Sequence, residues 1–347
     1  MNIWICAGAA LGTFILTWLS GFWLIPMLHK LKYGQTILEI GPKWHKAKKE
    51  GTPTMGGIGF IIAVTVCFTA GMIVFGYNGA NYLGDDKPEF IRSVSGMIMA
   101  VMFGLMGFLD DFIKVKKKHN EGLSWIQKVI FQVMIIAAYF ATMYISGLSR
   151  TIISLPWGAQ WDLGLFYYPL IGLVILYMVN AVNLTDGIDG LCSSVTTVYM
   201  TAFTVIAAIL GMFGQQLLAY CAAGGCIGFL VWNAPPAKVF MGDTGSMFLG
   251  GIVCALGLGC GVEVLMVIAG IVYVLEALSV VIQSTVFKIT KKIHHTKEGK
   301  RLFKMTPIHH HFELSNWSEF RIGGVFSLVG LVFGGLAILF AKMMFAK

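Results

Sequence analysis

The sequence predicts an all-α integral membrane protein with about ten transmembrane helices and both termini outside the cell. Hydrophobic residues make up 57% of its 347 residues and charged residues only 12%, whereas about 25% of a typical soluble domain is charged. Apolar segments of membrane-spanning length recur along the chain, and Lys and Arg collect in alternate connecting segments. This composition excludes a soluble globule, a disordered chain and a disulfide scaffold, and we interpret the seven scattered cysteines as small apolar residues.

The apolar segments define the expected helices in chain order. A bilayer core of about 30 Å requires about 20 apolar residues per helix. The expected spans are residues 4–28, 57–76, 92–109, 126–146, 163–181, 191–210, 215–232, 246–262, 264–287 and 322–341. The first is too long for the apolar region of a signal peptide and has no basic segment ahead of it, so we expect it to remain as a helix. We expect a single polytopic domain over residues 1–347, without internal repeats.

Ten spans place the connecting segments alternately on two sides of the membrane. One set of loops, at residues 29–56, 110–125, 182–190, 233–245 and 288–321, contains 19 Lys and Arg, whereas the termini and the other loops contain 4. The positive-inside rule assigns the first set to the cytoplasm. We attribute the formal net charge of +8 to this topology and to anionic lipids or substrates, and we expect no nucleic-acid partner.

Acidic residues at the cytoplasmic ends of the spans indicate a cation site. Five of them recur there: Asp110, Asp111, Asp186, Asp189 and Asp243. Adjacent carboxylates such as Asp110 and Asp111 repel each other and are costly at the edge of hydrocarbon, so a divalent ion or a bound cationic group would stabilise them. Carboxylate oxygens favour Mg²⁺ or Mn²⁺ over zinc. Alternatively, the pair marks the membrane boundary opposite Lys114 and Lys116. We expect an active site at the cytoplasmic face.

The segment 180–190 reads Asn-Ala-Val-Asn-Leu-Thr-Asp-Gly-Ile-Asp-Gly. Two Asn, two Asp and two Gly are more than a plain turn between helices needs. Carbonyls, carboxylates and permissive backbone suit the binding of ions and polar ligands. We therefore predict a binding turn between the fifth and sixth spans.

The segment 233–246 predicts a second binding loop. Pro235 and Pro236 break a helix, and Gly-Asp-Thr-Gly-Ser then opens the next span, so its backbone amides could face an anion or a metal-bound phosphate. Phe240 either stacks on a base or serves in packing. Asp243 is the only acid of this loop, which makes it the natural single metal ligand.

The first cytoplasmic loop has a lysine cluster followed by Gly-Thr-Pro-Thr-Met-Gly-Gly at residues 51–57. It is not a Walker A motif, because no Gly-Lys-Ser/Thr follows the glycines. The cluster suits either a diphosphate or anionic lipid, and the sequence leaves both open.

The last cytoplasmic loop contains His309, His310 and His311 in succession. Three consecutive imidazoles do not easily bind one ion, so we expect phosphate hydrogen bonding or proton transfer from at least one of them. Glu276, inside the ninth span, is costly in lipid and is expected to face protein or a polar crevice.

The motifs together resemble those of the polyprenyl-phosphate N-acetylhexosamine-1-phosphate transferases, most closely the muramoyl-pentapeptide branch. The resemblance runs from about residue 41 to residue 321 through residues 51–57, Phe-Leu-Asp-Asp at 108–111, Asn-Leu-Thr-Asp-Gly-Ile-Asp-Gly at 183–190, Phe-Met-Gly-Asp-Thr-Gly-Ser at 240–246 and Pro-Ile-His-His-His-Phe-Glu at 307–313. It implies a ten-helix enzyme of the bacterial cytoplasmic membrane, usually a homodimer, that depends on Mg²⁺. It also implies a reaction of peptidoglycan synthesis, in which phospho-MurNAc-pentapeptide passes from its UDP carrier to undecaprenyl phosphate, releasing UMP and forming lipid I.

The resemblance also assigns roles to individual residues. The catalytic set that it implies is Asp110, Asp111, Asp243 and His309, with Asp243 as the metal ligand and Asp110 and Asp111 as further candidates. The uridine pocket that it implies comprises Lys48, Gly187, Ile188, Asp189 and Phe240, and the polar rim comprises Asn183, Asp186, Asn233 and His309. Substrate binding also includes Thr52, His310 and His311, with the basic residues Lys114, Lys118 and Lys128 near the phosphates. Pro235 and the segment 321–324 depart from the family pattern.

The expected chemistry joins two anions, so it depends on charge neutralisation and positioning. Our hypothesis is a direct displacement in which Asp110 accepts the proton of the lipid phosphate or orients that phosphate, Asp111 assists and Asp243 holds Mg²⁺. A covalent aspartyl-phosphate route is the alternative. Two rival functions are a sister enzyme that transfers GlcNAc-1-phosphate from UDP-GlcNAc and a membrane transporter, whose polar residues would lie nearer the bilayer midplane.

Overall fold

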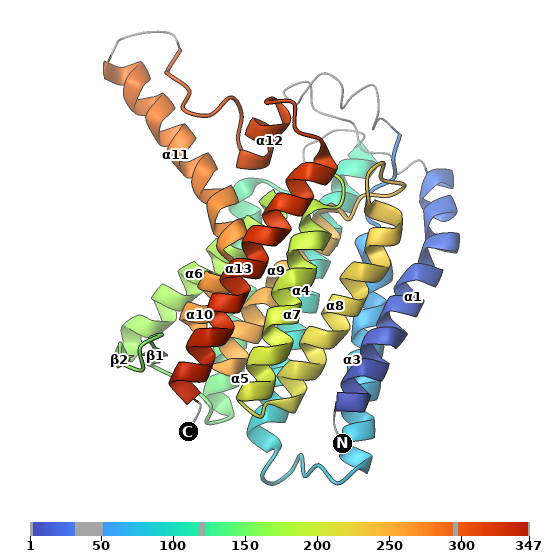
Figure 1. Cartoon of the computed structure of the whole chain (residues 1–347), viewed down its shortest axis with the longest axis vertical. Coiled ribbons are helices and arrows are strands. Elements are labelled where there is room, and N and C mark those ends of the chain that lie inside the picture. Colours follow the sequence, from blue (N-terminus) through green and yellow to red (C-terminus); the bar gives the residue numbers. More distant parts are fainter. Residues whose placement is uncertain (1–2, 32–50, 118–121, 294–297, 346–347) are drawn as a thin grey trace.

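The computed structural model describes residues 3–31, 51–117, 122–293 and 298–345 (Figure 1). Within these residues, 10 helices are long and apolar enough to cross a membrane, which confirms the predicted number of spans. They are α1 (Ile3–Lys30), α3 (Gly57–Tyr77), α4 (Lys87–Lys117), α5 (Trp125–Ile145), α6 (Tyr167–Thr185), α7 (Leu191–Ile209), α8 (Phe213–Asn233), α9 (Gly242–Cys260), α11 (Ile271–Ile293) and α13 (Glu319–Phe345). Shorter elements are the helices α10 (Glu263–Ala269) and α12 (Ile308–Glu313), the 3₁₀ turn η1 (Gly164–Phe166) and the strands β1 (Ile152–Ser154) and β2 (Gln160–Asp162).

The helix ends differ from the predicted spans where polar residues continue a helix. The helix α4 runs past residue 109 to Lys117, so Asp110 and Asp111 are helical, and α6 includes Asn183 in its last turn. An apolar window detects the hydrocarbon segment and not the end of hydrogen bonding, so it places these helix ends too early. The expected ninth span is divided at Gly270 into α10 and α11. The antiparallel hairpin β1–β2 was not expected.

Two ends of the helix bundle can be told apart in Figure 1. The first turn of α1 and the last turn of α13 lie at the lower end, with β1 and β2, and α12 lies at the upper end. We call these the hairpin end and the α12 end. The first turn of α1 and the last turn of α13 thus lie at the same end of the bundle; that both chain ends lie outside the cell stays a prediction.

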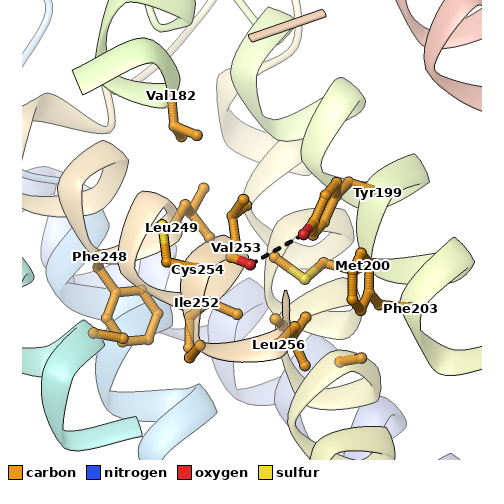
Figure 2. Close-up of a cluster of buried hydrophobic side chains, with 14 of the residues drawn as sticks. Val182, Tyr199, Met200, Phe203, Phe248, Leu249, Ile252, Val253, Cys254 and Leu256 are labelled. Carbon is orange, nitrogen blue, oxygen red and sulfur yellow. Dashed lines mark hydrogen bonds between the residues drawn. The ribbon is translucent and has the colours of Figure 1, made fainter. Parts of the chain in front are cut away.

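The helix α9 is the centre of the bundle. Every residue from Thr244 to Cys260 is buried, and apolar side chains of α7 pack around it (Figure 2). The hydroxyl of Tyr199 donates a hydrogen bond of 3.0 Å to the carbonyl of Val253. Gly250 and Gly251 let the backbone of α9 approach α6 and α4 closely, as small residues commonly do at helix contacts inside a membrane. The seven cysteines are all buried and form no disulfide, as the interpretation of them as small apolar residues predicts.

Candidate active site

Three acids meet at the α12 end of the bundle. Asp110 and Asp111 lie in the last turns of α4, and Asp243 lies in the first turn of α9. One carboxylate oxygen from each lies within 4.8 Å of the others. The structure therefore confirms that these three predicted residues come together, although Asp243 is 132 residues from Asp111 along the chain.

Two lysine ammonium groups bridge two of the acids. The Nζ of Lys114 lies 2.6 Å from Oδ2 of Asp110 and 3.0 Å from Oδ2 of Asp243. The Nζ of Lys128 lies 3.0 and 3.1 Å from the same two oxygens. With all five groups ionised, three carboxylates and two ammonium groups leave a formal excess of one negative charge. Both lysines were predicted near the phosphates, and the structure places them in the acid cluster.

The N-terminus of α5 supports Lys128 and Asp110 together. Ser124 and Gln127 form a capping box that fixes the first turn of α5, which carries Lys128. The backbone N–H of Leu123, just before this cap, donates to Oδ1 of Asp110 at 2.7 Å. With both oxygens occupied and only 1% of its side chain exposed, Asp110 is held in a single position.

Asp111 caps the N-terminus of α9. Its Oδ1 accepts the backbone N–H of Asp243 at 3.2 Å, and its Oδ2 accepts the N–H of Thr244 at 2.9 Å and the hydroxyl of Thr244 at 2.7 Å. We predicted that these amides would face an anion or a metal-bound phosphate. The amides of Asp243 and Thr244 do face an anion, but it is the carboxylate of Asp111 in the chain itself, so these two amides are not available to a bound phosphate.

The approach of α4 to α9 requires a glycine. A Cβ atom at Gly107 would lie 2.1 Å from the carbonyl oxygen of Asp243, closer than real Cβ contacts occur. Gly107 lies one turn before Asp111, so the same close contact sets Asp111 against the end of α9.

Asp243 is the acid with the most accessible side chain. Its side chain is 19% exposed, against 1% for Asp110. Its second oxygen accepts a hydrogen bond of 3.0 Å from the amide of Asn183, which also donates to Ser246 at 2.8 Å. Asp243 therefore faces the site, as the prediction of a metal ligand requires.

The predicted binding turn lies beside this cluster. Asp189 accepts the backbone N–H of Ala237 at 2.9 Å through its carboxylate. The amide oxygen of Asn233 accepts the N–H of Gly190 at 3.1 Å, and its nitrogen donates to the carbonyl of Val239 at 3.0 Å. The turn after α6 and the loop after α8 are therefore joined. Gly187 is exposed, Asp186 is half-buried, and Ile188 is buried.

Phe240 is held from both sides by its main chain. Its N–H donates to the carbonyl of Pro53 at 2.8 Å, and its carbonyl accepts the N–H of Gly56 at 2.9 Å. The N–H of Gly57 donates to the carbonyl of Met241 at 3.1 Å. The amides of Gly56 and Gly57 therefore hold the Phe240 loop and are not available to a diphosphate. Thr52 is half-buried at the start of this segment.

The three histidines face three different partners. Nδ1 of His309 lies 2.9 Å from Glu276 of α11, and Nδ1 of His310 lies 2.9 Å from Glu313. Nδ1 of His311 accepts the backbone N–H of Lys304 at 3.1 Å. This agrees with the prediction that they do not bind one ion together. His309 is fully buried, so its catalytic role stays a prediction.

Two predicted residues are not described by the structure, and a few residues near the site were not predicted. Lys48 and Lys118 lie outside the described residues. Ser246, which contacts Asn183, was not predicted, although a Ser three positions after Asp243 lies on the same helical face. The side-chain amides of Gln132 and Asn180 hydrogen-bond to each other at 3.0 and 3.3 Å, one turn after Lys128 in α5 and one turn before Asn183 in α6.

Known proteins resemble this chain over nearly its whole length. A family model described as glycosyl transferase family 4 matches residues 93–261. The phospho-N-acetylmuramoyl-pentapeptide-transferase of Shouchella clausii is 42% identical over 316 residues, which are 90% of each chain. The transferase of that name from Acetivibrio thermocellus is 44% identical over 307 residues, covering 87% of this chain and 85% of its own. The one from Desulforamulus reducens is 42% identical over 347 residues, covering 98% and 96%.

Proposed function

Because the chain belongs to the phospho-N-acetylmuramoyl-pentapeptide-transferase family, we propose that it transfers phospho-MurNAc-pentapeptide from UDP-MurNAc-pentapeptide to undecaprenyl phosphate. The products are UMP and lipid I, an intermediate of peptidoglycan synthesis. The observation that carries the proposal is the cluster of Asp110, Asp111, Asp243 and two lysines at one end of the bundle, where these residues meet from three helices.

The donor set of the cluster fits a hard divalent cation. Ligand oxygens of Mg²⁺ lie at most about 4.2 Å apart, twice the usual Mg–O distance of about 2.1 Å, so the separation of the acid oxygens, within 4.8 Å, needs only a small change. The ammonium groups of Lys114 and Lys128, which now contact Oδ2 of Asp110 and Asp243, would have to move aside for the ion. We propose that Asp243 holds Mg²⁺ with help from Asp110, while Asp111 stays on the amides of α9. When bound, Mg²⁺ supplies positive charge that offsets the charge of the donor diphosphate.

The reaction requires no strong base. An oxygen of undecaprenyl phosphate attacks the phosphorus that carries MurNAc, the P–O bond to the UMP phosphate breaks, and UMP leaves with the electron pair. Since the second pKa of a phosphate ester is about 6, the attacking phosphate is largely a dianion at neutral pH. Asp110, which already accepts hydrogen bonds from Leu123 and two lysines, acts in this proposal by orienting Lys114 and Lys128 toward the phosphates.

The donor nucleotide binds beside the cluster. Phe240 is half-buried on a main chain that hydrogen bonds hold in place, and the turn 186–190 is bonded to the same loop through Asp189 and Ala237. Base stacking on an aromatic ring contributes about 1–3 kcal/mol. We propose that uracil stacks on Phe240 and that Asp189, Asn183 and Asn233 line the pocket, with Lys48 and the remaining polar rim contributing as the resemblance implies.

The protein works at the bacterial cytoplasmic membrane in this proposal. The bias of 19 against 4 basic residues between the two sets of loops supports an orientation with the α12 end in the cytoplasm, where nucleotide sugars are found. A homodimer is proposed on the family resemblance alone.

Turnover of purified protein tests the function. Protein in detergent is incubated with undecaprenyl phosphate, Mg²⁺ and either UDP-MurNAc-pentapeptide or UDP-GlcNAc, and UMP and lipid product are measured. The proposal expects product only from the muramoyl donor and none in excess EDTA. Turnover of UDP-GlcNAc alone would establish the sister reaction instead, and a phospho-enzyme formed without lipid acceptor would establish the covalent route.

A further inference from the structure

The buried pair of His309 and Glu276 lies next to the binding turn. Nδ1 of His309 is 2.9 Å from Oε2 of Glu276, and neither side chain is exposed to solvent. An acidic side chain within a membrane-spanning helix is costly unless it is paired, and it commonly marks a functional position. The pair joins α12 to α11.

Glu276 fixes the orientation of the imidazole. A carboxylate only accepts hydrogen bonds, so Nδ1 of His309 carries the hydrogen between the two groups. Among the described residues, Nε2 of His309 has no hydrogen-bond partner. The bond to Glu276 is therefore the hydrogen bond that sets the direction of the ring, with the ring of His310 packed on it at a centroid distance of 4.2 Å.

The free edge of the ring supports Gly187. A Cβ atom at Gly187 would lie 2.2 Å from Nε2 and 2.6 Å from Cε1 of His309. Gly187 is exposed whereas His309 is fully buried, so the turn covers the imidazole. Only glycine allows the turn to rest on the ring this closely.

The turn is therefore held from two directions. On the α8 side, Asp189 and Gly190 bond to Ala237 and Asn233. On the α11 side, the contact with His309 lies under Gly187. Removal of the second support leaves the first intact, so the turn would shift without unfolding.

We infer that Glu276 is a positioning residue that acts through His309 to hold the turn 186–190 in the conformation that binds the nucleotide part of the donor. This inference rests on the proposed function, in which that turn binds the nucleotide. It has a selective consequence, because the acceptor lipid does not bind the turn: loss of Glu276 impairs the use of the donor and not the affinity for the acceptor.

Steady-state kinetics of four variants test the inference: Glu276→Leu, His309→Ala, the double variant and Gly187→Ala. Carboxylates that orient a metal-binding histidine typically contribute about 10- to 100-fold to metal affinity or activity, and we take the same range for Glu276, which orients His309 in the same way. We expect Glu276→Leu to lower kcat/KM for UDP-MurNAc-pentapeptide by about 10- to 100-fold, with KM for undecaprenyl phosphate unchanged within about twofold. The double variant should be no worse than His309→Ala, since residues that act as one unit are not additive. Gly187→Ala, which displaces the ring from the other side, should show the same donor-specific loss.

Two further variants separate positioning from general damage. Glu276→Gln keeps an oxygen that accepts from Nδ1 of His309 and should retain activity within about threefold. If the leucine variant does not fold, this variant and Gly187→Ala still test whether Glu276 positions the turn. Glu263→Leu removes a different buried glutamate, at the hairpin end and paired with Tyr167 at 2.7 Å, and should keep wild-type values of KM for both substrates.

Three results would overturn the inference while wild-type protein still turns over. They are full donor efficiency in Glu276→Leu, losses that multiply in the double variant, and a loss in Glu276→Gln as large as in Glu276→Leu. Absence of turnover by wild-type protein would instead reject the proposed function.

Discussion

Asp111 should contribute mainly to stability and Asp243 mainly to activity, although both belong to one acid cluster. Asp111→Ala leaves three donors without their acceptor: the N–H groups of Asp243 and Thr244 and the hydroxyl of Thr244. A buried donor without a partner costs about 1–3 kcal/mol, and the hydroxyl can turn to another acceptor. The two amides therefore give a loss of about 2–6 kcal/mol, or a fall in Tm of roughly 4–12 °C at about 2 °C per kcal/mol.

Asp243→Ala is the matched comparison. Lys114 and Lys128 keep Asp110, and Asn183 keeps Ser246, so no donor loses all its acceptors. We expect Tm to change by less than about 2 °C and kcat to fall at least about 100-fold, the usual loss for a group that stabilises charge in the transition state.

Thermal unfolding in detergent and UMP release are measured on the same preparations. The reasoning fails if Asp111→Ala keeps the wild-type Tm, because its hydrogen bonds to α9 would then contribute nothing. It also fails if the two variants lose equal stability, because the two adjacent parts of the cluster would then not differ in role.

Three other substitutions have specific expected outcomes. Lys128→Met removes a positive charge from the phosphates, so kcat should fall about 100-fold. The same ammonium group competes with Mg²⁺ for Asp110 and Asp243, so the Mg²⁺ concentration at half-saturation should also fall; a titration in which it rises would contradict this. Phe240→Ala should weaken UMP binding by about 5- to 160-fold, which corresponds to about 1–3 kcal/mol of stacking, with Phe240→Trp close to wild type; calorimetry with UMP decides. Gly107→Ala places a Cβ against the carbonyl of Asp243 and should lower both Tm and activity, whereas an unchanged Tm would show that α4 moves away easily.

The number of membrane spans could be predicted from the sequence. Of the five acids that the residues alone placed at one membrane face, three form the cluster in the described part of the chain, and the family resemblance singled out these three; Asp186 and Asp189 lie outside it. The apolar length of each span and the alternation of basic loops depend on residues close together in the chain. The placement of Glu276 against protein was also predicted and is confirmed by its bond to His309.

The division of labour within the cluster could not be predicted. Asp110 and Asp111 are adjacent acids with the same local surroundings, and only the packing of α4 on α9 turns one toward the lysines and the other toward the amides of α9. The partner of Glu276 lies 33 residues away in a different helix, and no local pattern indicates it. Lys48 and Lys118 lie outside the described residues, and their predicted roles stay predictions.

The main-chain attachment of Phe240 has a consequence for inhibitors. If uracil stacks on Phe240 as proposed, a nucleoside-like compound would bind to an aromatic ring on an already ordered loop, so its binding would lose little conformational entropy. The hydrogen bonds that order this loop join the peptide groups of residues 53, 56 and 240. Any residue other than proline at position 240 still provides the peptide N–H and carbonyl that these bonds use. A resistance mutation that replaces Phe240 would therefore leave the fold intact. Resistance would arise less easily against compounds that also contact the buried acids and lysines.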